Sequence, residues 1–276
     1  MERHRFDLDA YLNRVGMDAA GPPTLATLRR LHESHACAVP FEHLDVLAGE
    51  GVSLRPADVE AKLVGRRRGG YCFEQNALLG GVLEQLGFPV RYLAARVLLN
   101  AAPGVLPPRT HLFLAVGAGG REWVADVGIG GLTPIRPFPL EVGGPYENGL
   151  EPRRVVRREG PLPAFVRQAK LGKEWEDVCE FSGEAMPPPD REVANWFTST
   201  HPDSKFRRTL RVALVHADGS RSYLNGREFM RRAGAEVLER VEVRDRRGLA
   251  ALLDERFGLP LPAGTDLGFL WSDATA

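Results

Sequence analysis

The chain has 276 residues, of which 43% are hydrophobic, and its 36 basic residues balance 36 acidic ones. A chain of this size and composition can bury a full core without disulfides or a structural metal, and its zero net charge gives no sign of a nucleic-acid partner. Three cysteines without a C-x-x-C pair favour a reducing compartment and argue against a zinc site, so we expect no metal.

The N-terminal segment, residues 1–7, carries charges where a signal peptide needs an apolar core. Nowhere does the sequence contain a run of eighteen apolar residues. We therefore expect a cytoplasmic protein that does not bind membranes. Its oligomeric state is left open.

The first third of the sequence is predicted to be helical. Leu25, Leu28 and Leu31 form one apolar stripe over residues 24–35, and Pro56 suits the first turn of a helix over residues 56–64. A further helix is predicted from Cys72, with Gly87 as its stop.

Cys72 lies between a glycine turn, Gly69-Gly70, and this predicted helix start. The positive end of a helix dipole lowers the pKa of a thiol and favours the nucleophilic thiolate. The alternative is a small buried hydrophobic residue, which is how free cysteines commonly behave.

From residue 90 the pattern changes to short strands separated by Pro- and Gly-rich connections. The predicted elements are strands at 90–99, 111–116 and 122–127 with a hairpin turn at 118–120, loops and edge strands over 134–163, a break at 186–190, a domain boundary near 187–205, a strand pair at 210–215 and 222–224 around a turn at 217–220, and a helix at 246–257 ended by Gly258.

Two polar residues stand out in the predicted strands. His111 opens an apolar run, and Asp126 is predicted inside an otherwise apolar strand, where a carboxylate is costly without a partner. If the strands are neighbours, Asp126 can reach His111 while Cys72 approaches from the helix, which gives a nucleophile, a base and an orienting carboxylate. Separately, His111 can be an ordinary core or surface histidine and Asp126 a turn carboxylate.

Four segments resemble the arylamine N-acetyltransferase family, in order along the chain. They are Val39-Pro40-Phe41-Glu42-His43-Leu44, Arg68-Gly69-Gly70-Tyr71-Cys72-Phe73-Glu74, Asp126-Val127-Gly128-Ile129-Gly130-Gly131 and Asn195-Trp196-Phe197-Thr198-Ser199-Thr200-His201-Pro202. His43 departs from the family pattern, which has asparagine there.

The resemblance implies an α+β fold with a cysteine-protease-like core. Its parts would be an N-terminal helical bundle over residues 1–88 bearing Cys72, a central β-barrel over 89–195 bearing His111 and Asp126, and a C-terminal α/β lid over 196–276.

The same resemblance implies an acetyltransferase that uses acetyl-CoA as acyl donor and an arylamine or arylhydrazine as acceptor. Cys72 would become acetylated in a ping-pong reaction. His111 would hold Cys72 as a thiolate and later accept a proton from the attacking amine, and Asp126 would orient His111 and stabilise its charged form. The backbone N–H of Cys72 is a natural oxyanion donor.

Binding residues are predicted less sharply. Phe41, Tyr71 and Phe206 are candidates for an apolar acceptor pocket, although Phe41 can be an ordinary core phenylalanine. Thr110, Gly130 in the 128–131 turn, and Phe206 are candidates for coenzyme binding. The basic run 66–68 can pair with coenzyme phosphates or form a solvated face, and Arg68 can instead support the cysteine loop.

Three other functions remain open. The first is an amide synthase of the same family that closes macrolactams, and the second is a thiol hydrolase with a Cys-His-Asp triad. The third is a non-catalytic binding protein that carries a thiol, but under this interpretation an aspartate in an apolar strand would lack a purpose.

Overall fold

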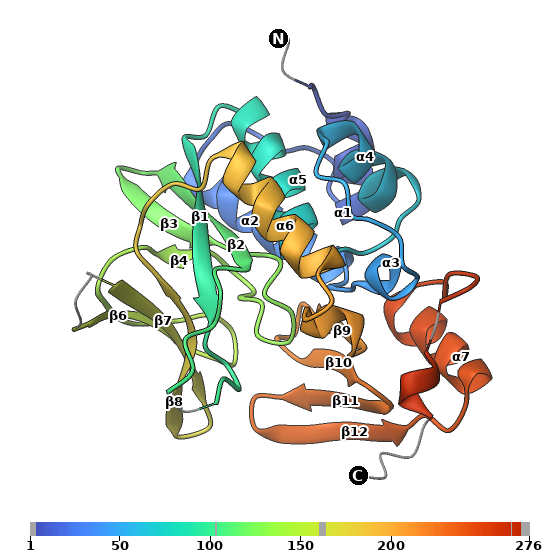
Figure 1. The fold of residues 1–276 in the computed structure, drawn as a ribbon. Coiled ribbons are helices and arrows are strands. Elements are labelled where there is room, and N and C mark those ends of the chain that lie inside the picture. The colour runs from blue at the N-terminus through green and yellow to red at the C-terminus, as the bar shows by residue number, and fades with distance from the viewer. Residues whose placement is uncertain (1–3, 103, 160–163, 266, 272–276) are drawn as a thin grey trace.

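The structure is a computed structural model that describes residues 4–102, 104–159, 164–265 and 267–271 (Figure 1). In chain order its elements are α1 (Leu8–Val15), α2 (Leu25–Ala38), α3 (Leu44–Leu47), α4 (Pro56–Glu60), the π-helical turn η1 (Ala61–Gly65), α5 (Cys72–Gln85), β1 (Val90–Val97), β2 (His111–Ala118), β3 (Arg121–Ala125), β4 (Phe138–Pro139), β5 (Gly143–Tyr146), β6 (Arg153–Arg158), β7 (Ala164–Leu171), β8 (Glu174–Phe181), α6 (Pro188–Thr200), the 3₁₀ turn η2 (Lys205–Arg207), β9 (Arg211–Val215), β10 (Arg221–Asn225), β11 (Glu228–Ala233), β12 (Glu236–Glu242), α7 (Arg246–Phe257) and the 3₁₀ turn η3 (Gly268–Leu270).

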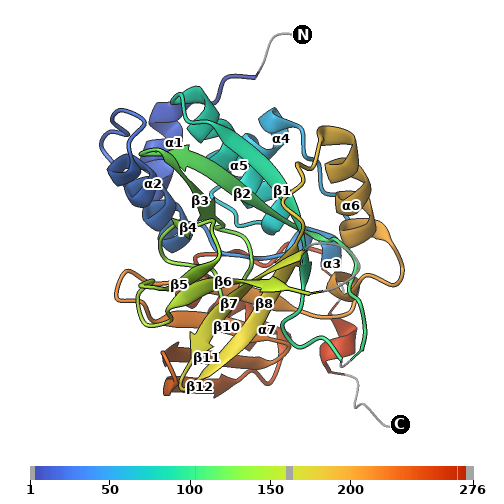
Figure 2. The same cartoon turned by 90° about the vertical axis from the view of Figure 1, so that its left-hand side faces the viewer.

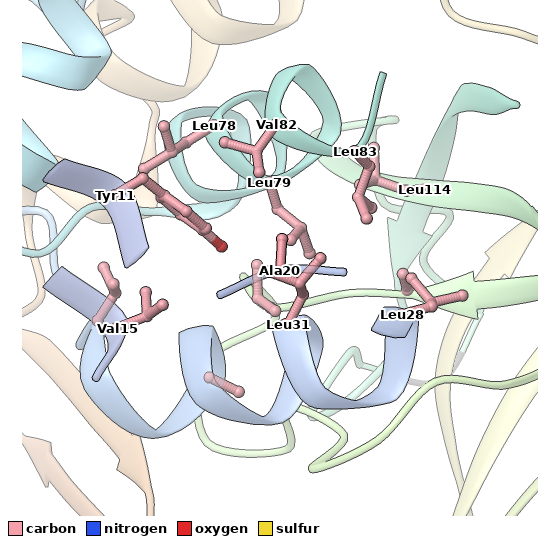
Figure 3. Packing of buried hydrophobic residues seen from close by; sticks show 14 of the residues in the cluster. Tyr11, Val15, Ala20, Leu28, Leu31, Leu78, Leu79, Val82, Leu83 and Leu114 are labelled. Carbon is pink, nitrogen blue, oxygen red and sulfur yellow. The ribbon is translucent and has the colours of Figure 1, made fainter. Parts of the chain in front are cut away.

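The N-terminal third is helical, as predicted. The Thr24 side chain accepts a hydrogen bond from the backbone N–H of Thr27 and caps α2, whose Leu28 and Leu31 are fully buried. These leucines pack against α1, α5 and β2 around Tyr11, Leu79 and their neighbours (Figure 3). Helix α5 therefore lies with one side in a dry core, which fixes the position of its first residue.

Eight strands form one antiparallel sheet in the order β4-β3-β2-β1-β8-β7-β6-β5. The turn between β2 and β3 places Gly119 and Gly120 at φ of 60° and 76°, which suits a two-residue hairpin loop. The sheet curls so that its two edges approach each other (Figure 2), and it is nearly closed, which agrees with the predicted central β-barrel. The resemblance to cysteine proteases stays a prediction.

The predicted strands up to β3 and the edge strands β4 and β5 are confirmed, except that residues 160–163 of the predicted loop region lie outside the described residues. Strands β7 and β8 were not predicted, and in β8 the charged residues Glu174, Glu176 and Asp177 interrupt the apolar alternation on which a strand prediction depends.

The proline run at residues 187–189, which was predicted to interrupt regular structure, also begins a helix. It opens α6, because proline lacks the N–H that the first helical turn leaves unpaired. The predicted domain limit between residues 195 and 196 therefore falls inside a helix, and the three-domain division stays a prediction.

After α6 the chain forms a second sheet, β12-β11-β10-β9, with α7 beside it (Figure 1). The predicted hairpin and the helix ended by Gly258 are confirmed, and Gly258 has the left-handed φ of 63° that ends such helices. An isolated bridge from Phe41 to Ala213 of β9 joins the second sheet to the helical region. Together these elements confirm the α+β class.

None of the helices in the described ranges combines the length and the apolar character that crossing a membrane requires.

Candidate active site

Cys72 is the first residue of α5, as predicted. Tyr71 before it is extended, with φ of −100° and ψ of −172°, and the Glu74 carboxylate accepts the Tyr71 backbone N–H at 3.1 Å. This bond satisfies one of the free N–H groups that every helix start carries. The thiol is buried, and Sγ lies 3.7 Å from the carbonyl oxygen of Thr110, the residue before His111.

A buried ionic cluster supports the cysteine loop. Lys62 Nζ lies 2.7 Å from a carboxylate oxygen of Asp45 and 2.7 Å from one of Glu74. Arg68 Nη2 lies 2.7 Å from Asp45 and 3.2 Å from Glu42. Arg68 therefore supports the loop, and the structure does not place it as a ligand for phosphates.

His111 and Asp126 meet at the first residue of β2 and the residue just after β3. His111 Nε2 lies 2.8 Å from Asp126 Oδ2, and both side chains are buried. Asp126 was predicted inside the strand, but it follows its end, where the ladder has stopped and the backbone can turn. Its Oδ1 accepts the Gly128 N–H at 3.1 Å and the Asn76 amide at 3.2 Å.

The electrostatics of Asp126 depend on its partners. Burial alone would raise the pKa of this carboxyl, but His111 and Arg167 outweigh burial and hold the pKa well below its ordinary range. Asp126 is therefore an anion at neutral pH.

The loop after Asp126 presses against the start of α5. A Cβ atom added to Gly128 would lie 2.6 Å from the Cα of Cys72, so no side chain fits at this position. Because His111 Nε2 is bonded to Asp126, Nδ1 is the ring nitrogen that this bond leaves available.

Burial raises the pKa of the Cys72 thiol to about 12, although hydrogen bonds from the Leu112 and Phe73 backbone oppose this effect. The pKa depression expected at a helix start is therefore wrong for the thiol taken alone. Desolvation at this buried position outweighs the helix dipole, whose effect is small.

Cys72 and His111 open onto a cavity of about 450 Å³. Of the predicted binding residues, Phe41, Thr110, Gly130 and Phe206 line it. The remaining lining residues described are mostly apolar, with a few cationic and amide groups: Val97, Leu99, Asn100, Gly128, Ile129, Gly131, Leu132, Leu171, Lys205, Arg211, Val212, Ala213, Tyr223, Leu224, Asn225 and Arg232.

Tyr71 does not line this cavity, so its prediction as a pocket residue is corrected. Its ring is fully buried behind Phe206, with the ring centroids 6.0 Å apart, and its hydroxyl donates to Asn195 Oδ1. The side chain of Tyr71 points away from the opening that Cys72 faces. The aromatic residue beside the cysteine thus ties α6 to the cysteine loop.

His43, the departure from the family pattern, lies behind the cavity wall. Its Nε2 accepts the backbone N–H of Arg211 at 3.2 Å, and its ring lies 4.6 Å from the Phe206 ring. Burial lowers the pKa of His43 to about 3, so the ring is neutral. His43 therefore links the start of β9 to Phe206.

Three residues of the site were not predicted. Asn76, one turn after Cys72, donates to the Leu112 carbonyl at 2.8 Å and to Asp126. His32 of α2 accepts the Asp126 backbone N–H at 3.1 Å. Arg167 of β7 donates to Asp126 Oδ2 at 2.7 Å. A polar residue in an apolar run was the signal that singled out Asp126, whereas Arg167 lies in a strand that also contains Gln168 and Lys170 and does not stand out in this way.

Within the described parts of the chain, no group of three or more His, Cys, Asp or Glu side chains is placed to hold a metal ion.

Comparison with known proteins agrees with this geometry. A family model described as N-acetyltransferase matches residues 24–265. The chain is 42% identical over 259 residues to the arylamine N-acetyltransferase of Mycobacterium tuberculosis (strain ATCC 25618 / H37Rv), covering 92% of this chain and 89% of that one. It is 42% identical over 274 residues to that of Mycolicibacterium smegmatis, covering 95% of each.

Among solved structures, the chain is similar to Mycobacterium marinum arylamine N-acetyltransferase in complex with CoA. The identity is 39%, the TM-score is 0.87, and the match covers 96% of this chain and 97% of that one.

Fold and site together define an α+β protein in which a helix-start cysteine and a histidine bonded to an aspartate line one cavity, an arrangement that suits a thiol nucleophile. The chain belongs to the arylamine N-acetyltransferase family.

Proposed function

We propose that this protein transfers an acetyl group from acetyl-CoA to the nitrogen of an arylamine or arylhydrazine through an acetylated Cys72. The observation that carries the proposal is that Cys72 and His111 line one cavity of about 450 Å³ and that Asp126 is bonded to His111. A cavity of this size, with mostly apolar walls and a few polar groups, suits a flat aromatic acceptor.

In the first half-reaction, Cys72 Sγ forms a bond to the thioester carbonyl carbon while its proton moves to His111 Nδ1. With the proton on His111, the thiolate and the imidazolium lie side by side, so the buried thiolate never stands alone. Asp126 stabilises the imidazolium through the 2.8 Å contact. The carbon–sulfur bond of the donor then breaks, and the departing thiolate takes the proton from His111.

In the second half-reaction, the acceptor nitrogen attacks the acetyl carbon on Cys72. His111 accepts a proton from this nitrogen and returns it to the Cys72 sulfur as the carbon–sulfur bond breaks. The backbone N–H of Cys72 at the helix start is the proposed donor to the oxyanion that forms in both halves. The kinetics are therefore expected to be ping-pong.

The cavity also has groups suited to an anionic donor. Lys205 and Arg211 line it, and no carboxylate of the described residues lies within ion-pair distance of either side chain. Arg232 lines it as well, but it pairs with Glu151 at 3.0 Å. Unpaired cations beside a substrate cavity favour a ligand that carries phosphates, such as acetyl-CoA.

The test is acetyl transfer to an arylhydrazine with the wild-type protein and with Cys72→Ser. We expect transfer by the wild type, an acetyl adduct on Cys72 in intact-mass spectra taken without acceptor, and no transfer by Cys72→Ser. Cys37→Ser is the matched control and should stay active, because Cys37 lies outside the site.

Substantial transfer by Cys72→Ser would contradict the mechanism. Loss of the thioester at a rate indifferent to added amine would favour the thiol hydrolase. No turnover of simple arylhydrazines by a folded wild-type protein would favour the amide synthase.

A further inference from the structure

His43 is a buried side chain beside the cavity to which the proposed reaction assigns no part. It directly precedes α3, only 2% of its surface is exposed, and it does not line the cavity. Because burial lowers its pKa to about 3, the imidazole carries no charge at neutral pH. One nitrogen of the neutral ring is then available as a hydrogen-bond acceptor.

That nitrogen takes the place of a backbone carbonyl in a short β-ladder. Phe41 and Ala213 exchange two backbone hydrogen bonds, of 2.8 and 3.0 Å, as a pair does in an antiparallel sheet. The next such pair would be His43 and Arg211, but the His43 carbonyl already accepts the N–H of Leu47 in α3. The Arg211 N–H donates instead to His43 Nε2 at 3.2 Å. The imidazole thus pairs a backbone donor that the turn into α3 would otherwise leave without its ladder partner.

The same ring packs against Phe206. The two ring centroids are 4.6 Å apart, at an interplanar angle of 46°. The Phe41 and Tyr71 rings lie farther from Phe206, at 6.2 and 6.0 Å. Phe206 and Phe41 line the cavity, whereas His43 and Tyr71 do not. His43 is therefore the nearest of the rings that support Phe206 from behind the cavity wall.

The position of the Phe206 ring depends on this packing. Phe206 is half-buried and belongs to η2, a turn of three residues of which none is buried. The ring packs against the apolar cluster that contains Cys72 and Phe41, so it forms part of the wall close to the reacting sulfur. In a close-packed wall, a change of volume behind a ring is felt at its front.

We propose that His43 is a positioning residue that sets acceptor specificity, because it holds Phe206 forward against the cavity and so favours acceptors with one aromatic ring over bicyclic ones. The inference rests on the proposed function, in which the aromatic acceptor binds along the apolar wall. A smaller side chain at position 43 leaves space behind Phe206. The Phe206 ring can move into this space, and the cavity widens beside Cys72.

The test compares two acceptors that differ by one fused ring, phenylhydrazine and 2-naphthylhydrazine. The quantity measured is the ratio of kcat/KM for the naphthyl acceptor to kcat/KM for the phenyl acceptor, with acetyl-CoA as donor. We expect His43→Asn to raise this ratio by about tenfold, the lower end of the effect of a small change of volume in an apolar pocket. A purely structural role would lower kcat/KM for both acceptors by the same factor and leave the ratio unchanged.

Two further variants separate the ring of His43 from its hydrogen bond. In His43→Gln the amide oxygen can still accept the Arg211 N–H, but no ring lies behind Phe206, so the ratio should rise as in His43→Asn. This variant provides the same test if the asparagine variant does not fold. His43→Phe keeps a ring behind Phe206 and lacks the acceptor, so the ratio should stay close to the parent value.

His216→Asn is the matched control. His216 follows β9, bonds to the Ser222 hydroxyl and does not line the cavity, so this variant should leave the ratio unchanged. An unchanged ratio in both His43→Asn and His43→Gln would overturn the proposal. An equal rise in His43→Phe would overturn it as well, because the hydrogen bond and not the ring would then control the wall.

A binding measurement separates this inference from the proposed function. In the Cys72→Ser background, ligand-observed NMR gives the affinities of the same two hydrazines without any acetyl transfer, and their ratio should again shift toward the naphthyl compound in His43→Gln. If it shifts but the chain with Cys72 intact transfers no acetyl group, the inference stands and the proposed function fails. If the intact chain transfers acetyl groups and neither ratio changes, the proposed function stands and the inference fails.

Discussion

The cysteine and the histidine of the site are held by two buried ionic clusters of different construction. On the helical side, Lys62 and Arg68 share the carboxylates of Glu42, Asp45 and Glu74, and each cation contacts at least two of them. On the sheet side, a single carboxylate, Asp126, serves both His111 and Arg167.

The two clusters therefore have different expected roles: the helical cluster stabilises the fold, and the sheet cluster takes part in the proposed reaction. The helical cluster lies under the backbone of the cysteine loop and touches no group that changes charge in the proposed reaction, so its loss should mainly affect stability. The sheet cluster includes His111, which gains and loses a proton in the proposed reaction. Its loss should affect the rate far more than the fold.

The largest expected effect is on the sheet side. Asp126→Asn should lower kcat for acetyl transfer by about 10³–10⁴-fold, because the amide neither supports the imidazolium nor fixes its tautomer. Steady-state assays at saturating donor measure this effect. Asp254→Asn, an exposed change of the same kind on α7, should keep full activity. Activity within a few-fold of wild type in Asp126→Asn would refute the role assigned to Asp126.

The next effect belongs to the helical side. Lys62→Met should lower the free energy of unfolding by about 3–5 kcal/mol, because the buried carboxylates of Asp45 and Glu74 lose a shared partner. Urea unfolding followed by tryptophan fluorescence measures it, with Lys173→Met in an exposed turn as the control. If kcat fell by more than the loss of folded protein explains, the purely stabilising role assigned to the helical cluster would be wrong.

The smallest expected effect is the loss of folding stability at low pH. The folded pKa of Asp126 is depressed, so its contribution to stability is present above the ordinary aspartate value near 4 and is lost as the pH falls below it, by about 2–3 kcal/mol. Asp126→Asn should therefore flatten the fall in unfolding free energy between about pH 4 and pH 2. Burial raises the pKa of Glu74 despite Lys62, so Glu74→Gln should not flatten it.

A steep acid slope that survives in Asp126→Asn would place the acid-sensitive group elsewhere. Urea titrations at several pH values on the same variants distinguish the two results.

Much of this arrangement follows from local sequence signals. The apolar spacing after Cys72 predicts α5, the paired glycines at 119 and 120 predict the β2–β3 hairpin, and Asp126 stands out in an apolar run. These signals lie within a few residues of the features they predict. They also suffice to bring the three reacting residues together.

Signals that depend on distant partners are not visible in this way. Arg167 is 41 residues beyond Asp126 and acquires its role only because β7 curls behind β2. Tyr71 adjoins the cysteine in sequence, yet the extended backbone at the helix start turns its ring into the interior. Orientation at that point is decided by α6, which the sequence supplies more than a hundred residues later.

Gly128 lies so close to the Cys72 backbone that the geometry of the site depends on how the helices pack against the sheet. Cys72 belongs to the helical part of the molecule, and His111, its proposed base, belongs to the sheet. A contact without room for a methyl group allows little movement between these two parts. Activity is therefore expected to depend on the packing between helices and sheet as well as on the reacting side chains. Denaturant, pressure or a distant substitution that loosens this interface is expected to abolish activity while the secondary structure is still intact.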